Sequence, residues 1–286
     1  MTTTLDVRFV TCSKYPEGDP ETSDLAAYLN RNGIATDVQA WDADVDWAKS
    51  RLCVIRSAWD YHRHIDRFLT WTEIASTRTQ LWNPAPLIRW NAHKRYLLDL
   101  ARDGIPIVPT RVVRRGDHAG LTDTVAAFDT DEVVVKHAVS LDGEGMQRMH
   151  RFAIGEASRL VDEADVLIQP YVASVAHEGE ISALFIEGTF AHAVRKRAAT
   201  GEFRVQERYG GTTDRIDIAA AFLALADRVV RAIPQATLYA RVDMVSWRDQ
   251  PCLGELELIE PSFYLRACRA TQATFFEAIS RLLTRS

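Results

Sequence analysis

The chain has 286 residues, of which 47% are hydrophobic and 26% are charged, and its formal net charge is −5 at pH 7. This length can enclose two or three modest domains, and the composition is ordinary for a soluble globular protein. The acidic balance argues against a general nucleic-acid or membrane-surface binder, which would carry a basic excess. No apolar run approaches membrane-spanning length, so we expect neither nucleic acid nor a membrane as a partner.

The cysteines, at positions 12, 53, 252 and 268, have no paired spacing. A disulfide framework or a zinc site is therefore not expected, and a reducing cytoplasm fits this pattern. The start of the sequence lacks the basic region and apolar run of a secretion signal. We therefore expect a cytoplasmic protein.

The first part of the chain predicts a small parallel α/β domain over residues 1–88. Apolar runs at 5–11, 34–40 and 52–56 predict strands, and helical periodicity covers 23–32 and 65–76. Ligands gather beyond the carboxyl ends of the strands in such sheets. The residues at these ends are Ser13, Lys14, Arg56, Ser57, Asp60 and Tyr61.

The rest of the chain predicts α+β structure. Residues 83–86, Asn-Pro-Ala-Pro, are typical of a linker, and a helix is expected over 91–103 with Gly104 as its stop. Later apolar runs predict antiparallel hairpins instead of repeated βαβ units. The expected strands are 132–136, 146–150, 166–172, 181–186 and 190–194, and the expected helices are 125–128, 219–232 and 275–283.

Lys136 ends an apolar strand just before the loop 140–145, which contains Gly143 and Gly145. A lysine there can place its charge on a phosphate, while a glycine loop offers backbone N–H donors. Taken alone, the pattern also fits a surface lysine beside an ordinary turn. The loop matches neither the Walker P-loop nor the Rossmann fingerprint.

Three other segments could bind anions. The basic stretch 192–197 could neutralise a triphosphate or bind a carboxylate, and Arg204 has the fork geometry for a carboxylate. Asn91 and Lys94 begin a predicted helix, where anions are favoured. Each also has a simpler interpretation: a solvated basic turn, an exposed loop, and a capping Asn beside a surface Lys.

Residues 241–262 predict two strands joined by a polar turn at 247–251, with acidic side chains inside both strands. Glu255 and Glu257 point to the same face, and antiparallel pairing would bring Asp243 near them. Three buried carboxylates would repel one another unless a cation lay among them. Hard oxygen ligands completed by phosphate describe a magnesium–nucleotide site. A half-exposed hairpin with an acidic face is the alternative.

In this order and spacing, the residues resemble the ATP-grasp superfamily of ATP-dependent carboxylate–amine ligases, over nearly the whole chain. The resemblance implies a fold of α/β and α+β character, with ATP and Mg²⁺ as cofactors. An N-terminal Rossmann-like pre-ATP-grasp domain, residues 1–88, would precede two lobes, 89–170 and 171–286, that clamp the nucleotide. Dimers are common in the superfamily, so a homodimer is a possible assembly.

The resemblance also implies roles for individual residues. ATP would be bound by Lys94, Lys136, Ser140, Gly143, Gly145, Gln169, Tyr171, Val172, Glu180, Arg195 and Lys196, with Glu178 a less favoured alternative to Glu180 at the ribose. Magnesium would be held by Asp243, Glu255 and Glu257, although asparagine is usual at position 257 and Glu260 competes with it. Catalysis would fall to Lys136, Lys196, Arg204 and Arg241, and substrate binding to Arg56, Ser57, Asp60, Tyr61 and Arg204.

Four segments, which begin at Arg56, Arg89, His192 and Glu255, are similar to the group that contains the cycloserine-forming O-ureido-serine cyclo-ligase. The resemblance implies phosphoryl transfer from ATP to the carboxylate of a small amino-acid-like substrate, followed by displacement of phosphate by an internal nucleophile. An intermolecular amino-acid or peptide ligase is one alternative. A nucleotide-binding protein without catalysis is the other.

Overall fold

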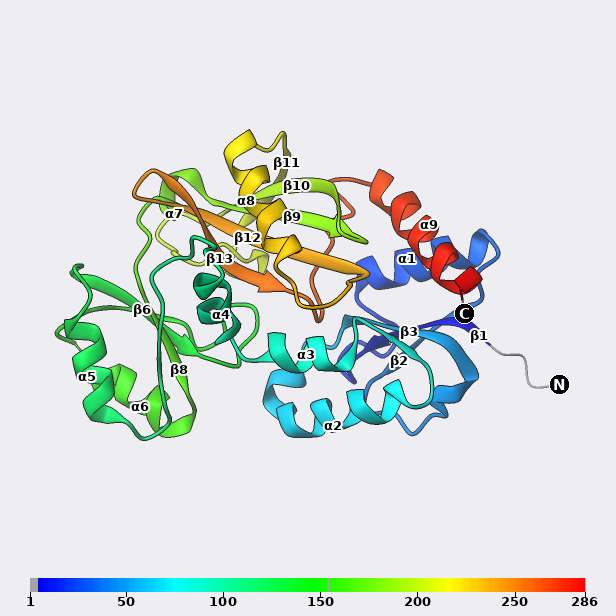
Figure 1. The fold of residues 1–286 in the computed structure, drawn as a ribbon, viewed down its shortest axis with the longest axis horizontal. Helices are drawn as coiled ribbons and strands as arrows, with labels where there is room; N and C mark the ends of the chain where they lie inside the picture. Colours follow the sequence, from blue (N-terminus) through cyan, green and yellow to red (C-terminus); the bar gives the residue numbers. More distant parts are fainter. Residues whose placement is uncertain (1–4, 154, 286) are drawn as a thin grey trace.

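Three β-sheets organise the chain in the computed structural model, which describes residues 5–153 and 155–285. The expected lack of a secretion signal concerns in part residues 1–4, which lie outside this range. Figure 1 shows the three sheets as separate bodies around a central region. Within the described residues, no helix has both the length and the apolar character needed to cross a membrane.

The N-terminal sheet is parallel, as predicted, with strand order β2-β1-β3-β4. Its helices α1 and α2 follow the amphipathic segments expected from the sequence, and Gly33 has the positive φ of 85° that a left-handed helix stop requires. The elements are β1 Leu5–Thr11, α1 Pro20–Arg31, β2 Thr36–Ala40, β3 Ser50–Ser57, α2 Ile65–Ser76 and β4 Gln80–Trp82.

The predicted linker at 83–86 is wrong, and the predicted helix at 91–103 is confirmed only over residues 96–102, with Gly104 at positive φ after it. A helix, α3 (Ala85–Ala92), begins within the prolines, where proline is tolerated in the first turn, and a second, α4 (Tyr96–Arg102), follows after a break. The break falls at Lys94, whose backbone N–H donates to Ala138 O at 2.8 Å. A long-range contact therefore interrupts a segment for which helical periodicity alone predicts one continuous helix.

The middle sheet is antiparallel, with strand order β5-β8-β6-β7. Helices α5 and α6 cover it through a separate core that includes Leu121, Val125, Val133, Val161 and Ile168. From the sequence, only a short helix at 125–128 was predicted near the end of α5, and α6 was not predicted. The elements are β5 Arg111–Val113, α5 His118–Ala126, β6 Glu132–His137, β7 Gln147–His150, α6 Gly155–Glu163 and β8 Val166–Pro170.

The C-terminal sheet has five antiparallel strands in the order β11-β10-β9-β12-β13. Its two tight hairpins have the positive-φ turn residues Glu187–Gly188 and Arg248–Asp249, as type I′ turns require. The elements are α7 Val175–Glu178, β9 Glu180–Ile186, β10 Thr189–Arg197, β11 Thr212–Ile216, α8 Ala220–Arg231, β12 Tyr239–Trp247, β13 Gln250–Glu257 and α9 Ala270–Arg285.

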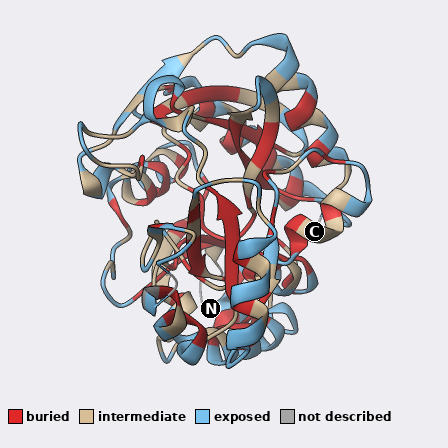
Figure 2. Ribbon diagram, turned by 90° about the vertical axis from the view of Figure 1, so that its left-hand side faces the viewer, coloured by how far each residue is buried: buried red, intermediate tan, exposed pale blue. Residues whose placement is uncertain are grey.

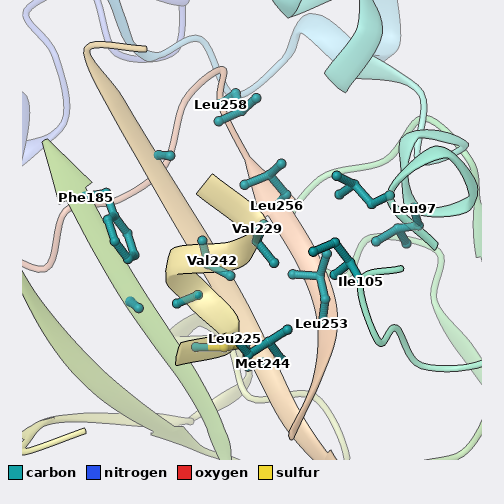
Figure 3. Close-up of a cluster of buried hydrophobic side chains, with 14 of the residues drawn as sticks. Leu97, Ile105, Phe185, Leu225, Val229, Val242, Met244, Leu253, Leu256 and Leu258 are labelled. Atoms are coloured by element: carbon teal, nitrogen blue, oxygen red, sulfur yellow. The ribbon is translucent and has the colours of Figure 1, made fainter. Parts of the chain in front are cut away.

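One face of this sheet carries a large hydrophobic core. Val242 and Met244 of β12 and Leu256 of β13 pack with Leu225 and Val229 of α8 (Figure 3). Because strand residues alternate between faces, the residues between them, Arg241, Asp243, Glu255 and Glu257, point to the opposite face. The core thereby fixes which face of the hairpin presents charge.

The last helix, α9, packs on the first sheet and not only on its own. Phe275 and Ile279 of α9 share a core with Phe9 of β1, Leu25 of α1 and Tyr239 of β12. Figure 1 shows α9 beside α1, and Figure 2 shows the buried strands enclosed by helices and loops with exposed residues. The two ends of the described chain are therefore joined by one hydrophobic core.

The buried side chain of His192 in β10 should make the stability of the fold depend on pH. Burial lowers the pKa of this side chain to about 4, with a hydrogen bond at the Phe263 backbone opposing the shift and nearby Arg215 contributing to it. Since the unfolded value is near 6.5, the neutral folded form contributes stability above that pH, which is lost as the pH falls towards 4. We expect wild-type protein to lose about 2 kcal/mol more than His192→Gln between pH 7 and pH 5 in urea titrations.

The control for this experiment is His177→Gln, because His177 is an exposed histidine on α7. This variant should keep the wild-type slope of stability against pH. Equal slopes for His192→Gln and the wild type would show that His192 does not titrate in the way its burial implies.

Candidate active site

A cleft of about 890 Å³ receives side chains from strands of the middle and C-terminal sheets and from the segments that follow β1 and β3 of the N-terminal sheet. Most of the residues that the sequence indicated for ATP, metal or substrate line it. They are Asp60, Tyr61, Lys94, Lys136, Ser140, Gly143, Gln169, Tyr171, Val172, Glu180, Lys196, Arg204, Arg241, Asp243, Glu255 and Glu257.

The floor of the cleft is the β12–β13 hairpin, whose register follows the sequence prediction. Asp243 pairs directly with Glu255, and Arg241 pairs with Glu257. The register shifts between Asp243 and Met244, at Gly254 on the opposite strand, which is a β-bulge. The bulge lets Leu253 and Leu256 both reach the core while Glu255 faces the cleft.

Four buried cations converge on these carboxylates. Asp243 accepts from Arg241 Nη2 at 2.8 Å and from Lys196 Nζ at 3.2 Å. Glu255 lies 2.8 Å from Lys94 Nζ, in the break between α3 and α4, and 3.6 Å from Lys136 Nζ of β6. Arg241 also pairs with Glu257, and Lys196 with Glu180.

The charges perturb one another strongly. Burial opposes ionisation of Glu255, but Lys94 and Lys136 outweigh it and lower its pKa to about 2. Burial raises the pKa of Glu257 to about 7, with Asp243 and Glu255 adding to the shift and Arg241 opposing it. Burial likewise lowers the pKa of Lys136. Such shifts within a cleft are typical of functional sites.

The carboxylates are the type of ligand that magnesium prefers, but they do not form a preorganised metal site. Among residues 5–153 and 155–285, no three His, Cys, Asp or Glu side chains are grouped closely enough to hold a metal ion. The sequence expectation of three converging carboxylates is therefore not met in this arrangement, in which Glu255 pairs with the two lysines while Asp243 and Glu257 share Arg241. Magnesium commonly uses only one or two carboxylates together with phosphate oxygens, and the facing pair Asp243 and Glu255 suits that mode.

The glycine loop at 140–145 is fixed from several sides. Lys94 Nζ donates to Ser140 O at 2.7 Å. Glu144 accepts from Arg63 at 2.7 Å and lies 3.0 Å from His62, both from the N-terminal part, while Asp142 pairs with Arg208 at 3.1 Å. Gly143 and Gly145 have positive φ values of 68° and 69°, which glycine adopts without strain. The loop is thus bridged to both neighbouring bodies across the cleft.

The strand end after β8 forms another wall. Gln169 is buried and donates from Nε2 to Thr110 Oγ1 at 2.9 Å. Arg148 lies over the ring of Tyr171 at 3.7 Å, and Val172 packs with Val108 and Val245. This wall combines apolar surface with a few polar side chains, which suits a flat heterocycle.

Two of the predicted nucleotide residues lie outside the lining. Arg195 is adjacent to Lys196 in β10, so the two side chains point to opposite faces, and only Lys196 reaches the cleft. We therefore withdraw Arg195 from the proposed contacts. Gly145 is also absent from the lining, although its neighbours in the loop are present.

Arg56 and Ser57 were predicted as substrate contacts, and the structure corrects this. Arg56 is 2% exposed, pairs with Glu21 at 3.0 Å, and lies over the ring of Phe263 at 3.5 Å. Ser57 is fully buried and lies 3.0 Å from Thr11 Oγ1. Both are enclosed behind the cleft wall, because strand β3 continues through them before the chain turns at Trp59.

Asp60, Tyr61 and Arg204 do line the cleft. Asp60 accepts from Trp41 Nε1 at 2.7 Å, which orients its carboxylate. Arg204 forms a bidentate pair with Glu202 and lies over the ring of Tyr209 at 3.5 Å. Its fork is therefore already occupied, so a substrate carboxylate would have to compete with Glu202.

Several residues of the site were missed from the sequence. Glu21 accepts from the backbone N–H groups of Phe263 and Leu265, and Tyr264 lines the cleft with its phenol near Arg241. Glu21 follows Asp19-Pro20 at a helix start, where an acid is an ordinary capping signal. No local pattern could therefore have connected it with a loop more than 240 residues away.

Comparisons with known proteins agree with this geometry. A family model described as the N-terminal domain of D-cycloserine synthetase DcsG matches residues 7–83. The cycloserine biosynthesis protein DcsG of Streptomyces lavendulae is 35% identical over 271 residues, which are 88% of this chain and 90% of that protein. The crystal structure of D-cycloserine synthetase DcsG matches with a TM-score of 0.87 and 31% identity, covering 97% of this chain and 99% of the other.

More distant structures define the fold. The D-alanine–D-alanine ligase of Bacillus anthracis complexed with ATP has a TM-score of 0.70 at 15% identity, with 98% of both chains covered. The ATP-grasp ligase PsnB, complexed with a precursor, Mg and ADP, has a TM-score of 0.64 at 14% identity, with 97% of this chain and 98% of the other covered.

The three sheets around a charged cleft thus form the fold of the ATP-grasp ligases, as the sequence predicted. Within that class, the chain belongs to the D-cycloserine synthetase family. It is accordingly a member of a family of ATP-dependent ligases.

Proposed function

We propose that this chain uses ATP to activate the carboxylate of an amino-acid-like substrate as an acyl phosphate, and that the substrate is O-ureido-serine, which cyclises to cycloserine. The observation that carries the proposal is the group of four buried cations interleaved with Asp243, Glu255 and Glu257. Burying so many charges is costly unless a ligand uses them. The phosphates of a triphosphate would pair with the buried cations, and its magnesium ion would pair with the carboxylates.

In this proposal, Lys94, Lys136, Lys196 and Arg241 bind phosphate oxygens, and Gln169, Tyr171 and Val172 contact the base. Glu180 takes the ribose, and Ser140, Gly143 and Gly145 belong to the loop over the phosphates. Asp243 and Glu255, with Glu257 as the third predicted ligand, would hold magnesium, which would supply charge neutralisation for phosphoryl transfer. The cations then keep the carboxylate and phosphate, which repel each other, in contact.

The division into domains at 1–88, 89–170 and 171–286 stays part of this proposal. The glycine loop and its partners Arg63 and Arg208 support a closing movement that excludes water from the acyl phosphate. The four cysteines are free and buried, which supports a reducing, cytoplasmic location. A homodimer remains a possible assembly.

The proposal predicts magnesium-dependent release of ADP that requires O-ureido-serine. The assay follows ADP while mass spectrometry identifies the product, with pooled free amino acids as competing substrates and EDTA as the control. Cyclisation adds no second building block to the product. A product that joins two amino acids would overturn the cyclisation, and bound ATP with no turnover on any substrate would overturn the ligase.

A further inference from the structure

Glu260 is a buried acid of the cleft that the proposed nucleotide site does not use. It is 4% exposed and lines the cleft, and its Oε2 has no hydrogen-bonding partner among the described residues. It follows β13 by three residues, where the chain passes from one core to another. Leu258 packs in the core of the C-terminal sheet, and Ile259 packs with Trp41 and Tyr61 of the N-terminal part.

The backbone around Glu260 is held by an unusual series of contacts. Each carbonyl from 258 to 261 accepts a hydrogen bond from a side chain elsewhere in the fold. The donors are Asn83 to Leu258 at 2.7 Å, Tyr239 to Ile259 at 2.8 Å, Trp59 to Glu260 at 3.1 Å and Arg56 to Pro261 at 3.2 Å. The backbone is therefore fixed before any ligand binds, while the carboxyl group itself stays free.

The ion pairs described in the cleft do not include Glu260. The four buried cations Lys94, Lys136, Lys196 and Arg241 already pair with Glu180, Asp243, Glu255 and Glu257. Within the described chain, no ion pair is formed by Glu260. Burial raises the pKa of Glu260 well above its usual range, with Glu257 adding to the shift, so its charged form needs a positive partner. The phosphates of a nucleotide cannot supply one, and the magnesium ion is assigned to Asp243, Glu255 and Glu257.

Resting on the proposed function, we infer that Glu260 binds the α-ammonium group of the amino-acid substrate and so determines specificity for amines. The substrate would then lie between the N-terminal and C-terminal parts of the chain, with its carboxylate towards Arg241 and its ammonium group at Glu260. Asp60 and Tyr61, which follow β3 of the N-terminal sheet, also line the cleft. Trp59 and Arg56 act as positioning residues, because they hold the backbone of Glu260 and Pro261.

The test compares two ligands and two proteins by calorimetric titration in the presence of a non-hydrolysable ATP analogue and magnesium. The ligands are O-ureido-serine and the same molecule without its α-amino group. Wild-type protein should prefer the amine roughly 10- to 100-fold, the range expected for a hydrogen bond between charged groups. Glu260→Gln should remove most of this preference while its affinity for the ATP analogue stays within about twofold of the wild type.

Each outcome has a distinct meaning. A wild type that binds both ligands equally overturns the inference even if Glu260→Gln fails to fold, because that comparison needs no variant. Loss of ATP-analogue or magnesium affinity in Glu260→Gln would instead make Glu260 a metal ligand, which also overturns it. A wild type that binds the ATP analogue but neither ligand contradicts the proposed function itself. Glu277→Gln, which removes an exposed acid of α9 outside the cleft, is the matched control and should keep the wild-type preference.

Discussion

Glu255→Gln is expected to lower the rate of ADP release by at least about a thousandfold, since several kcal/mol of charge stabilisation by the metal would be lost. The substitution keeps the shape of the side chain but removes the charge that faces Asp243 across the hairpin. ATP binding should persist, because Lys94 and Lys136 stay free to bind phosphates. The measurement is magnesium-dependent ADP release at saturating ATP, with nucleotide affinity determined separately.

The matched control is Glu187→Gln, which removes an acid from the β9–β10 turn of the same sheet, outside the cleft. It should retain wild-type activity. Full activity in Glu255→Gln would remove this residue from the proposed magnesium site. Loss of ATP binding in parallel with activity would indicate that Glu255 mainly organises the two lysines.

Arg56→Met is expected to destabilise the fold by about 3 kcal/mol, near the lower end for a broken buried ion pair. Methionine keeps most of the volume, but Glu21 loses its cationic partner and Pro261 O loses its donor. Glu21 keeps its bonds from Phe263 and Leu265, which limits the cost. Thermal denaturation should show a fall in Tm of roughly 5 °C, given the unfolding entropy expected for 286 residues.

A double-mutant cycle with Glu21→Gln checks the mechanism. If the two side chains act as a pair, Glu21→Gln should cost less in the Arg56→Met background than in the wild type. Wild-type stability in Arg56→Met, with loss only of substrate affinity, would restore the direct substrate contact that the sequence suggested.

The sequence predicts most of this fold because its signals are local. The parallel N-terminal sheet, the α8 helix and the β12–β13 hairpin follow from hydrophobic periodicity and turn residues. The pairing of Asp243 with Glu255 follows from strand alternation once the turn is located. Lys136 beside the glycine loop is also visible locally, although only the fold shows that Lys94 reaches the same carboxylate.

The sequence predictions fail where contacts between residues far apart in the chain determine the structure. The break between α3 and α4 depends on the contact of Lys94 with Ala138, which no window of sequence contains. Arg56 was assigned to the substrate because it ends a strand, yet Glu21 and Phe263 enclose it. Arg195 was grouped with Lys196 because they are adjacent, although adjacency in a strand separates their side chains.

The shared core of α9 and the first sheet has a consequence for any attempt to divide this chain. A fragment that ends near residue 88 would keep Phe9 and Leu25 but lose Phe275 and Ile279, which cover them. Its sheet would then present an apolar face to water, and such faces favour aggregation. Although a separate family model matches the N-terminal part, we therefore expect it not to fold as an autonomous unit without α9.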